Sequence, residues 1–183
     1  MKVPQFRFGH LGIYVTDVEK MLEFYTRVLG FTVSDRGPIR DLELVFLSRN
    51  PDEHHQFVLA TGRPRDAGFT TINQISLRVP ALEDLKAAHA ALLAEGIGDL
   101  RIVSHGNAWS IYFHDPEGNR IEFYVPTPWY TPQPYAEPLD LTAPVDEIMR
   151  RTEAECRNRP GFKTREEWSG DLARRLEKSA TSS

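Results

Sequence analysis

Hydrophobic and polar positions first alternate and then change period near the start of the chain. In residues 8–15 every second residue from Leu11 to Val15 is apolar, which is the period of a half-buried strand. The following apolar residues recur every three or four positions, which predicts a helix that begins at the N-cap Asp17 and ends at Gly30. Three strand-like runs follow, separated by turn-forming residues such as Gly37 and Pro38, at residues 31–34, 42–47 and 56–60.

The same order of elements begins again 64 residues later. Residues 74–79 overlay residues 10–15, and a helical pattern over about residues 82–95 follows. Three further strands are predicted, the last two joined by a turn at residues 115–119, at residues 101–104, 109–114 and 120–125. We therefore predict an α+β fold for residues 1–127: two tandem βαβββ modules, about 6–61 and 71–126, which form one curved mixed sheet around a central groove.

The rest of the chain, residues 128–183, differs in composition and is predicted to be a C-terminal extension. Six prolines between Pro126 and Pro144 exclude a regular helix or a central strand and predict an extended arm. Two charged helices should follow at residues 145–157 and 163–178. We expect the arm to lie against the domain or against another subunit, because it carries large apolar side chains at Trp129, Tyr130, Tyr135 and Trp168.

Composition and charge exclude several classes of protein. The 183 residues include 22 Lys and Arg against 26 Asp and Glu, and a net charge of −4 gives no basis for binding nucleic acid. No run approaches the roughly 18 apolar residues of a membrane span, and the first residues lack the apolar run of a secretory signal. We expect a cytoplasmic soluble protein that binds no membrane. The single cysteine, Cys156, excludes an internal disulfide and, in a helix expected to be exposed, indicates no catalysis.

The repeat brings three candidate metal ligands into equivalent or facing positions. His10 and Gln74 occupy the same place in the first strand of each module, and Glu122 lies in the last strand, where a buried carboxylate is costly unless it is paired or binds metal. Such donors suit Fe(II), Mn(II), Ni(II) or Zn(II). The overlay also pairs residues 56–59 with 122–125, so Gln56 is a candidate fourth ligand. Without a metal, His10 would be a hydrogen-bonded strand histidine and Gln74 part of a polar network.

Two strings in the sequence, residues 10–17 and residues 113–122, together with Phe24-Tyr25 and residues 29–31, resemble the vicinal oxygen chelate superfamily. This superfamily includes glyoxalase I, bleomycin-resistance proteins and type I extradiol dioxygenases. The resemblance covers about residues 6–126. It implies paired βαβββ modules and, in the catalytic members, a divalent metal in the groove.

The segment around the pair His54-His55 is similar to the extradiol branch, which implies that His55 handles protons beside the iron. Tyr112, ten residues before Glu122, matches the tyrosine that contacts a catecholic substrate, and His105 falls near a further active-site histidine. The resemblance thus implies a ring-cleaving dioxygenase that uses Fe(II), a catechol-like aromatic substrate and O2, with His55, Tyr112 and His105 around the substrate and His10, Gln74 and Glu122 as ligands. We also expect a homodimer.

Gln74 departs from this branch, which normally has a second histidine at this position. Because some glyoxalase I enzymes use glutamine as a ligand, a glyoxalase-like isomerase or lyase with a redox-silent metal is one alternative. A metal-free binding protein of the bleomycin-resistance kind is another. Five other residues or segments are expected to be structural: residues 115–119 as a turn, and His89, His114, Trp109 and Phe57.

Overall fold

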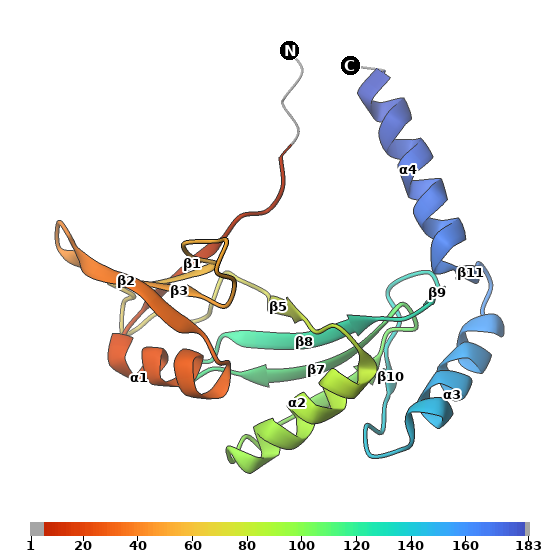
Figure 1. Cartoon of the computed structure of the whole chain (residues 1–183), viewed down its shortest axis with the longest axis horizontal. Helices are drawn as coiled ribbons and strands as arrows, with labels where there is room; N and C mark the ends of the chain where they lie inside the picture. The colour runs from red at the N-terminus through yellow and green to blue at the C-terminus, as the bar shows by residue number, and fades with distance from the viewer. Residues whose placement is uncertain (1–5, 182–183) are drawn as a thin grey trace. The chain divides into compact units, whose positions relative to one another are not determined.

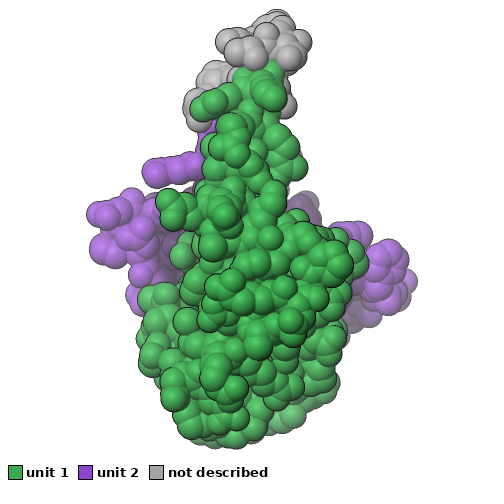
Figure 2. Space-filling view, turned by 90° about the vertical axis from the view of Figure 1, so that its right-hand side faces the viewer, with its two compact units in different colours: residues 1–3, 75–113, 121–183 green, residues 4–74, 114–120 purple. Residues whose placement is uncertain are grey.

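The computed structural model describes residues 6–181 and divides them into two compact units (Figure 1, Figure 2). Residues 6–74 and 114–120 form what we call the N-terminal unit, and residues 75–113 and 121–181 form the C-terminal unit. The turn at residues 114–120 therefore groups with the N-terminal unit although it joins two strands of the second module.

The N-terminal unit contains the first βαβββ module. Its elements are β1 (Leu11–Val15), α1 (Val18–Glu23), the π-helix η1 (Phe24–Val28), β2 (Thr32–Ile39), β3 (Leu42–Ser48) and β4 (Phe57–Thr61). The helix begins as predicted, because the side chain of Asp17 accepts a hydrogen bond from the N–H of Lys20 at 3.1 Å. The strands form a sheet in the order β1-β4-β3-β2, in which β1 and β4 are parallel. Figure 1 shows α1 on one side of this sheet. Val15, Leu59 and Met21, from β1, β4 and α1, are buried.

Strand β2 is longer than the sequence pattern predicted. Gly37 and Pro38 were expected to form a turn, but they lie within the strand and pair with Leu44 and Glu43. The turn lies two residues later, at Arg40, whose φ is 52°. Proline is tolerated here because β2 is at the edge of the sheet, where a missing N–H donor interrupts no ladder.

The C-terminal unit contains the second module. Its first elements are β5 (Ile75–Arg78), α2 (Leu82–Ala94), β6 (Arg101–Ser104), β7 (Ala108–His114) and β8 (Arg120–Pro126). The predicted βαβββ order is confirmed, and β5 pairs with β8 in parallel as β1 does with β4. The single sheet expected from the sequence is replaced by two sheets, of four and five strands. The reason is that the first strand of each module hydrogen-bonds to the last strand of its own module.

The C-terminal extension packs on the second module. It contains β9 (Trp129–Tyr130), β10 (Glu137–Pro138), α3 (Val145–Arg157), β11 (Lys163–Thr164) and α4 (Arg165–Thr181). β10 extends the five-stranded sheet at its edge beside β6, and β9 pairs with β11. The indole N–H of Trp109, which is buried as predicted, donates to Thr152 of α3 at 2.9 Å. Figures 1 and 2 show α4 projecting from the rest of its unit.

The expected exposure of Cys156 is wrong. Its side chain is fully buried, in line with Ile148 and Thr152 on α3. These residues are spaced four apart, so they form the one stripe of an otherwise charged helix that faces the unit. Burial raises the pKa of the Cys156 thiol to about 11, which makes the side chain a small apolar group rather than a nucleophile.

Candidate functional site

One face of the five-stranded sheet carries most of the candidate residues of the C-terminal unit. The rings of Phe113 on β7 and Phe123 on β8 lie 5.2 Å apart and therefore point to the same side. Successive side chains of a strand point to opposite faces, so the neighbouring Tyr112 and Glu122 lie together on the other side. The sheet thus separates an apolar face from a polar face, and we call the second the Glu122 face.

Glu122 is buried, with 6% of its surface exposed. The hydroxyl of Ser76, its register partner on β5, donates a hydrogen bond to its carboxylate. A hydrogen bond of this kind fixes the position of the carboxylate, as it does for carboxylates that bind metals. The sequence analysis did not single out Ser76. The sequence pattern that could have identified Ser76 is its place two residues after Gln74, on the same side of the predicted strand.

Tyr112 and His105 form a hydrogen-bonded pair. The Nδ1 atom of His105 lies 2.6 Å from the backbone oxygen of Tyr135, and its Nε2 atom lies 2.9 Å from the hydroxyl of Tyr112. A carbonyl oxygen only accepts, so Nδ1 carries the proton. In the neutral ring Nε2 is then the acceptor, and the Tyr112 hydroxyl donates to it. The sequence predicted both residues near a substrate, and the structure brings these two together.

The extension holds His105 in this orientation. Besides the carbonyl of Tyr135, the side-chain amide of Gln133 donates to the backbone oxygen of His105 at 2.8 Å. The next residue, Gly106, has a φ of 71°, and its carbonyl accepts a hydrogen bond from Thr127 at 2.5 Å. The Pro-rich arm therefore determines the tautomer and position of a candidate catalytic histidine, a role that residue spacing alone did not indicate.

In the N-terminal unit the candidate histidines form a cluster. The ring of His55 lies 4.3 Å from the ring of His10 and 5.1 Å from the ring of Phe46. The Nδ1 atoms of His54 and His55 are 2.9 Å apart. Desolvation, together with the neighbouring His10 and His54, lowers the pKa of His55 from its ordinary value. A lowered pKa favours the neutral imidazole, which has a nitrogen lone pair that can accept a proton.

The strand registers correct the overlay that made Gln56 a fourth ligand. Leu11 pairs with Phe57, and its equivalent in the second module, Ile75, pairs with Ile121. The counterpart of Glu122 is therefore Val58, which has no donor atom, and Gln56 corresponds to Arg120. The side-chain oxygen of Gln56 accepts a hydrogen bond from the backbone N–H of Arg49 at 2.9 Å. The first module thus supplies no side-chain ligand at the place of Glu122.

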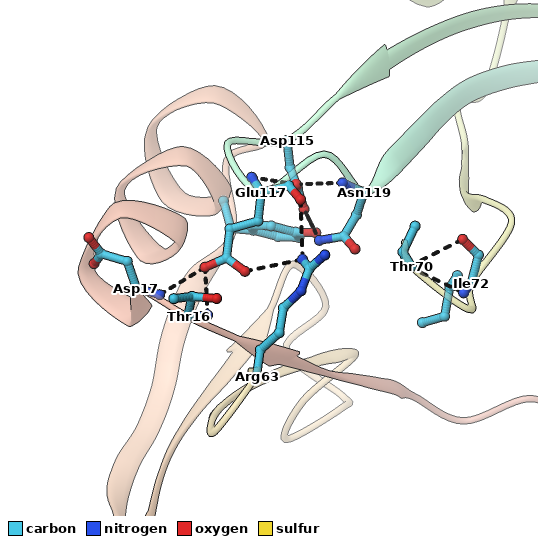
Figure 3. A network of polar contacts seen from close by, with 9 residues as sticks. Thr16, Asp17, Arg63, Thr70, Ile72, Asp115, Glu117 and Asn119 are labelled. Atoms are coloured by element: carbon cyan, nitrogen blue, oxygen red, sulfur yellow. Dashed lines mark hydrogen bonds and ion pairs between the residues drawn. The ribbon is translucent and has the colours of Figure 1, made fainter. Parts of the chain in front are cut away.

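Residues 115–119 form the predicted turn and also a polar network in the N-terminal unit (Figure 3). The carboxylate of Glu117 accepts hydrogen bonds from the backbone N–H groups of Thr16 and Asp17 at 2.6 and 2.8 Å. Arg63 forms an ion pair with it at 3.2 Å. Desolvation raises the pKa of Asp115, which also accepts two bonds from Asn119. Sequence reasoning missed Glu117 and Arg63, whose partners are distant in the chain.

The candidate ligands come from both units: His10 and Gln74 from the N-terminal unit and Glu122 from the C-terminal unit. Within residues 6–181 no group of three or more His, Cys, Asp or Glu side chains is arranged to hold a metal. These residue types do not include amides such as Gln74. His10, Gln74 and Glu122 would offer an imidazole nitrogen, an amide oxygen and a carboxylate. This donor set fits a divalent transition metal with open coordination positions.

Comparison with known proteins identifies the family. The model of the Glyoxalase/Bleomycin resistance protein/Dioxygenase superfamily matches residues 7–123, and the chain belongs to this superfamily. Biphenyl-2,3-diol 1,2-dioxygenase 2 of Rhodococcus globerulus is 27% identical over 123 residues, which are 65% of this chain and 62% of that protein. Lactoylglutathione lyase of Pseudomonas putida is 30% identical over 154 residues, 68% of this chain and 87% of that protein. The chain thus spans less than two thirds of the length of the dioxygenase.

Solved structures share the fold. A glyoxylase/bleomycin resistance protein/dioxygenase domain from Frankia sp. EAN1pec has a TM-score of 0.59 at 17% identity and covers 67% of this chain and 99% of its own. The fosfomycin resistance protein FosX of Listeria monocytogenes, solved with Mn(II) and sulfate, has a TM-score of 0.51 at 16% identity and covers 69% and 95%. Members of the superfamily typically bind divalent metals. None of the helices in the described part of the chain is long and apolar enough to cross a membrane.

Proposed function

We propose that this protein is a metal-dependent, extradiol-type dioxygenase that cleaves the ring of a catechol-like aromatic compound with O2. The proposal rests mainly on the strand registers. Val58 pairs with Gly12 in the first module, and Glu122 pairs with Ser76 at the equivalent place in the second module, so only the second module has a carboxylate there. His10, Gln74 and Glu122 would then be three ligands to a divalent metal, and a metal with three protein ligands would keep open coordination positions for substrate. Similarity to biphenyl-2,3-diol 1,2-dioxygenases supports the same substrate class.

In this proposal a divalent metal, Fe(II) in the first instance and otherwise Mn, Ni or Zn, supplies Lewis acidity and, for iron, electron transfer between diol and oxygen. The chain's own residues position the reactants and move protons. Ser76 orients the carboxylate of Glu122, and Tyr112 places its hydroxyl oxygen, which His105 holds by a hydrogen bond, toward the diol. His55 takes a proton from the substrate and returns it later, the ordinary role of a general base.

A glyoxalase-like isomerase or lyase is the second candidate. It is favoured by the longer match to lactoylglutathione lyase, which extends over 87% of that protein. In this reaction the metal would be redox-silent, and Gln74 would be a normal ligand. Gln56 cannot serve as the general base of such a reaction, because its side-chain amide is not titratable near neutral pH.

The test starts from protein purified without oxygen and loaded in turn with Fe(II), Mn(II), Ni(II) or Zn(II). The proposal predicts O2 uptake and a coloured ring-fission product from 2,3-dihydroxybiphenyl or catechol with iron. Glu122→Gln should abolish both the O2 uptake and the coloured product. Glu137→Gln should abolish neither, because Glu137 is an exposed carboxylate elsewhere in the same unit. Ser76→Ala should weaken metal binding by about 10–100-fold, as expected when the group that orients a ligand is lost.

Other outcomes would contradict the proposal. Isomerisation of a hemithioacetal with nickel or zinc and no O2 uptake would support the glyoxalase-like alternative. Ligand binding that is unaffected by metal removal and by Glu122→Gln would support a metal-free binding protein. The same preparations test the proposed homodimer, because light scattering after gel filtration should give twice the chain mass of 20.9 kDa.

A further inference from the structure

A cavity of about 230 Å³ lies within the C-terminal unit, where β5 and β8 end. It is lined by the guanidinium-bearing residues Arg78 and Arg165 and by the rings of Tyr124, Tyr130 and Trp168. Arg78 and Tyr124 are register partners on β5 and β8, and Arg165 and Trp168 come from the first turn of α4. The extension therefore closes one side of a cavity whose other side belongs to the sheet.

The charge of this lining is uncompensated. The other lining residues within the described chain are apolar, aromatic or amide-bearing, so no carboxylate lies in the wall. Among residues 6–181 neither guanidinium forms an ion pair or a side-chain hydrogen bond, in contrast to Arg63 beside Glu117 or Arg157 beside Glu153. Two unpaired arginines beside one cavity attract an anion, and a guanidinium matches the two oxygens of a carboxylate.

The aromatic residues of the lining favour a ligand that also has an apolar part. The rings of Tyr130 and Trp168 are stacked, with centroids 5.5 Å apart and planes inclined by 18°. This pair is a flat apolar wall. A ligand with both an anionic group and an aromatic or alkyl body would use the arginines and the rings together.

The cavity adjoins the Glu122 face. Arg78 follows Ser76 by two residues and Tyr124 follows Glu122 by two, so all four side chains lie on the same side of the sheet. Two residues of a strand span about 7 Å. A ring held near Glu122 would therefore reach Arg78, and with it the cavity that Arg165 also lines, through a short side chain.

We propose that this cavity is a specificity site for a carboxylate carried on a short side chain of the aromatic substrate. The inference rests on the proposed function for the identity of the substrate as an aromatic diol. The recognition of the carboxylate depends only on the cavity, and it needs neither the diol, the metal nor O2.

The test measures binding to metal-free protein by titration calorimetry, with 3-phenylpropionate and its uncharged analogue 3-phenylpropionamide as probes. The carboxylate should bind about tenfold or more tightly than the amide, since a hydrogen bond to a charged group has at least this effect on affinity. Arg78→Gln and Arg165→Gln should each remove most of that preference and leave the affinity for the amide unchanged. Raising the salt concentration should weaken only the binding of the carboxylate.

Arg150→Gln is the matched control, because Arg150 is an exposed arginine of the same unit and does not line this cavity. It should bind both probes like the unmodified protein. Equal affinity for the two probes, or an unchanged preference in the double variant Arg78→Gln/Arg165→Gln, would overturn the inference. The proposed function fails separately: protein that prefers the carboxylate but never consumes O2 with a diol retains the specificity site and loses the dioxygenase assignment.

Discussion

Replacing Gly106 by alanine should destabilise the protein through two separable effects. Gly106 has a φ of 71°, a conformation that costs an L side chain about 1–2 kcal/mol. An added Cβ would also lie 2.4 Å from Cγ2 of Thr131, 3.1 Å from Sγ of Cys156 and 3.3 Å from Cδ1 of Tyr135. These neighbours must shift, and overpacking of this kind costs about 1–3 kcal/mol. The expected loss in the free energy of unfolding is therefore about 2–5 kcal/mol.

Gly96→Ala separates the two effects. Gly96 has a similar φ of 78°, but an added Cβ would meet nothing within 4 Å. This variant should lose only the conformational contribution of about 1–2 kcal/mol. For a chain of this length each kcal/mol lowers Tm by about 2–4 °C. Gly106→Ala should thus unfold at a clearly lower temperature than Gly96→Ala.

Urea unfolding followed by circular dichroism gives both free energies from the midpoint and the slope. If Gly106→Ala loses no more stability than Gly96→Ala, the close packing of the arm beside His105 is refuted. A functional readout accompanies the measurement. Because Tyr135 would be displaced, the hydrogen bond from Nδ1 of His105 should weaken, and the ring proton signals of His105 in an NMR spectrum should move in Gly106→Ala and not in Gly96→Ala.

Three further predictions concern single side chains. Glu117→Gln should lower the free energy of unfolding by about 1.5–3 kcal/mol, measured in urea, because it weakens two N–H bonds and the ion pair with Arg63. The Cys156 thiol should resist Ellman's reagent at pH 8 in the folded protein and react once in denaturant, because it is fully buried and its pKa is raised to about 11. Tyr112→Phe should cost about 1 kcal/mol in stability, since it removes the donor to His105, and should lower kcat of the proposed reaction more than it raises KM.

Each of these has a control and an opposing result. Glu23→Gln removes an exposed ion pair with Arg27 and should change the free energy of unfolding by less than about 1 kcal/mol. If Glu117→Gln loses no more stability than Glu23→Gln, the network around Glu117 does not stabilise the fold as argued. Rapid labelling of Cys156 in native buffer would show that α3 opens readily. Tyr14→Phe, at a residue that is 60% exposed, should be neutral, and a similarly neutral Tyr112→Phe would exclude a role for the pair with His105.

Much of the fold was predictable because the relevant signals are local. Period-two alternation, the cap at Asp17 and the stops at Gly30 and Gly96 lie within a few residues of the elements they define, and the structure confirms the two βαβββ modules. The limits of β2 were missed because the effect of Pro38 depends on whether its strand is central or at an edge. That property belongs to the sheet and not to the segment.

The site divides in the same way. The sequence alone indicated which side chains could bind a metal, the repeat that relates His10 to Gln74, and the turn at residues 115–119. Each of these depends only on residue identity and spacing along the chain. Only the tertiary structure decided that Val58 and not Gln56 is the counterpart of Glu122, because register depends on hydrogen bonds between strands distant in the chain. Tertiary packing likewise determines the burial of Cys156 and the partners of His105. Those contacts join the second module to an extension whose own sequence carries no sign of where it packs.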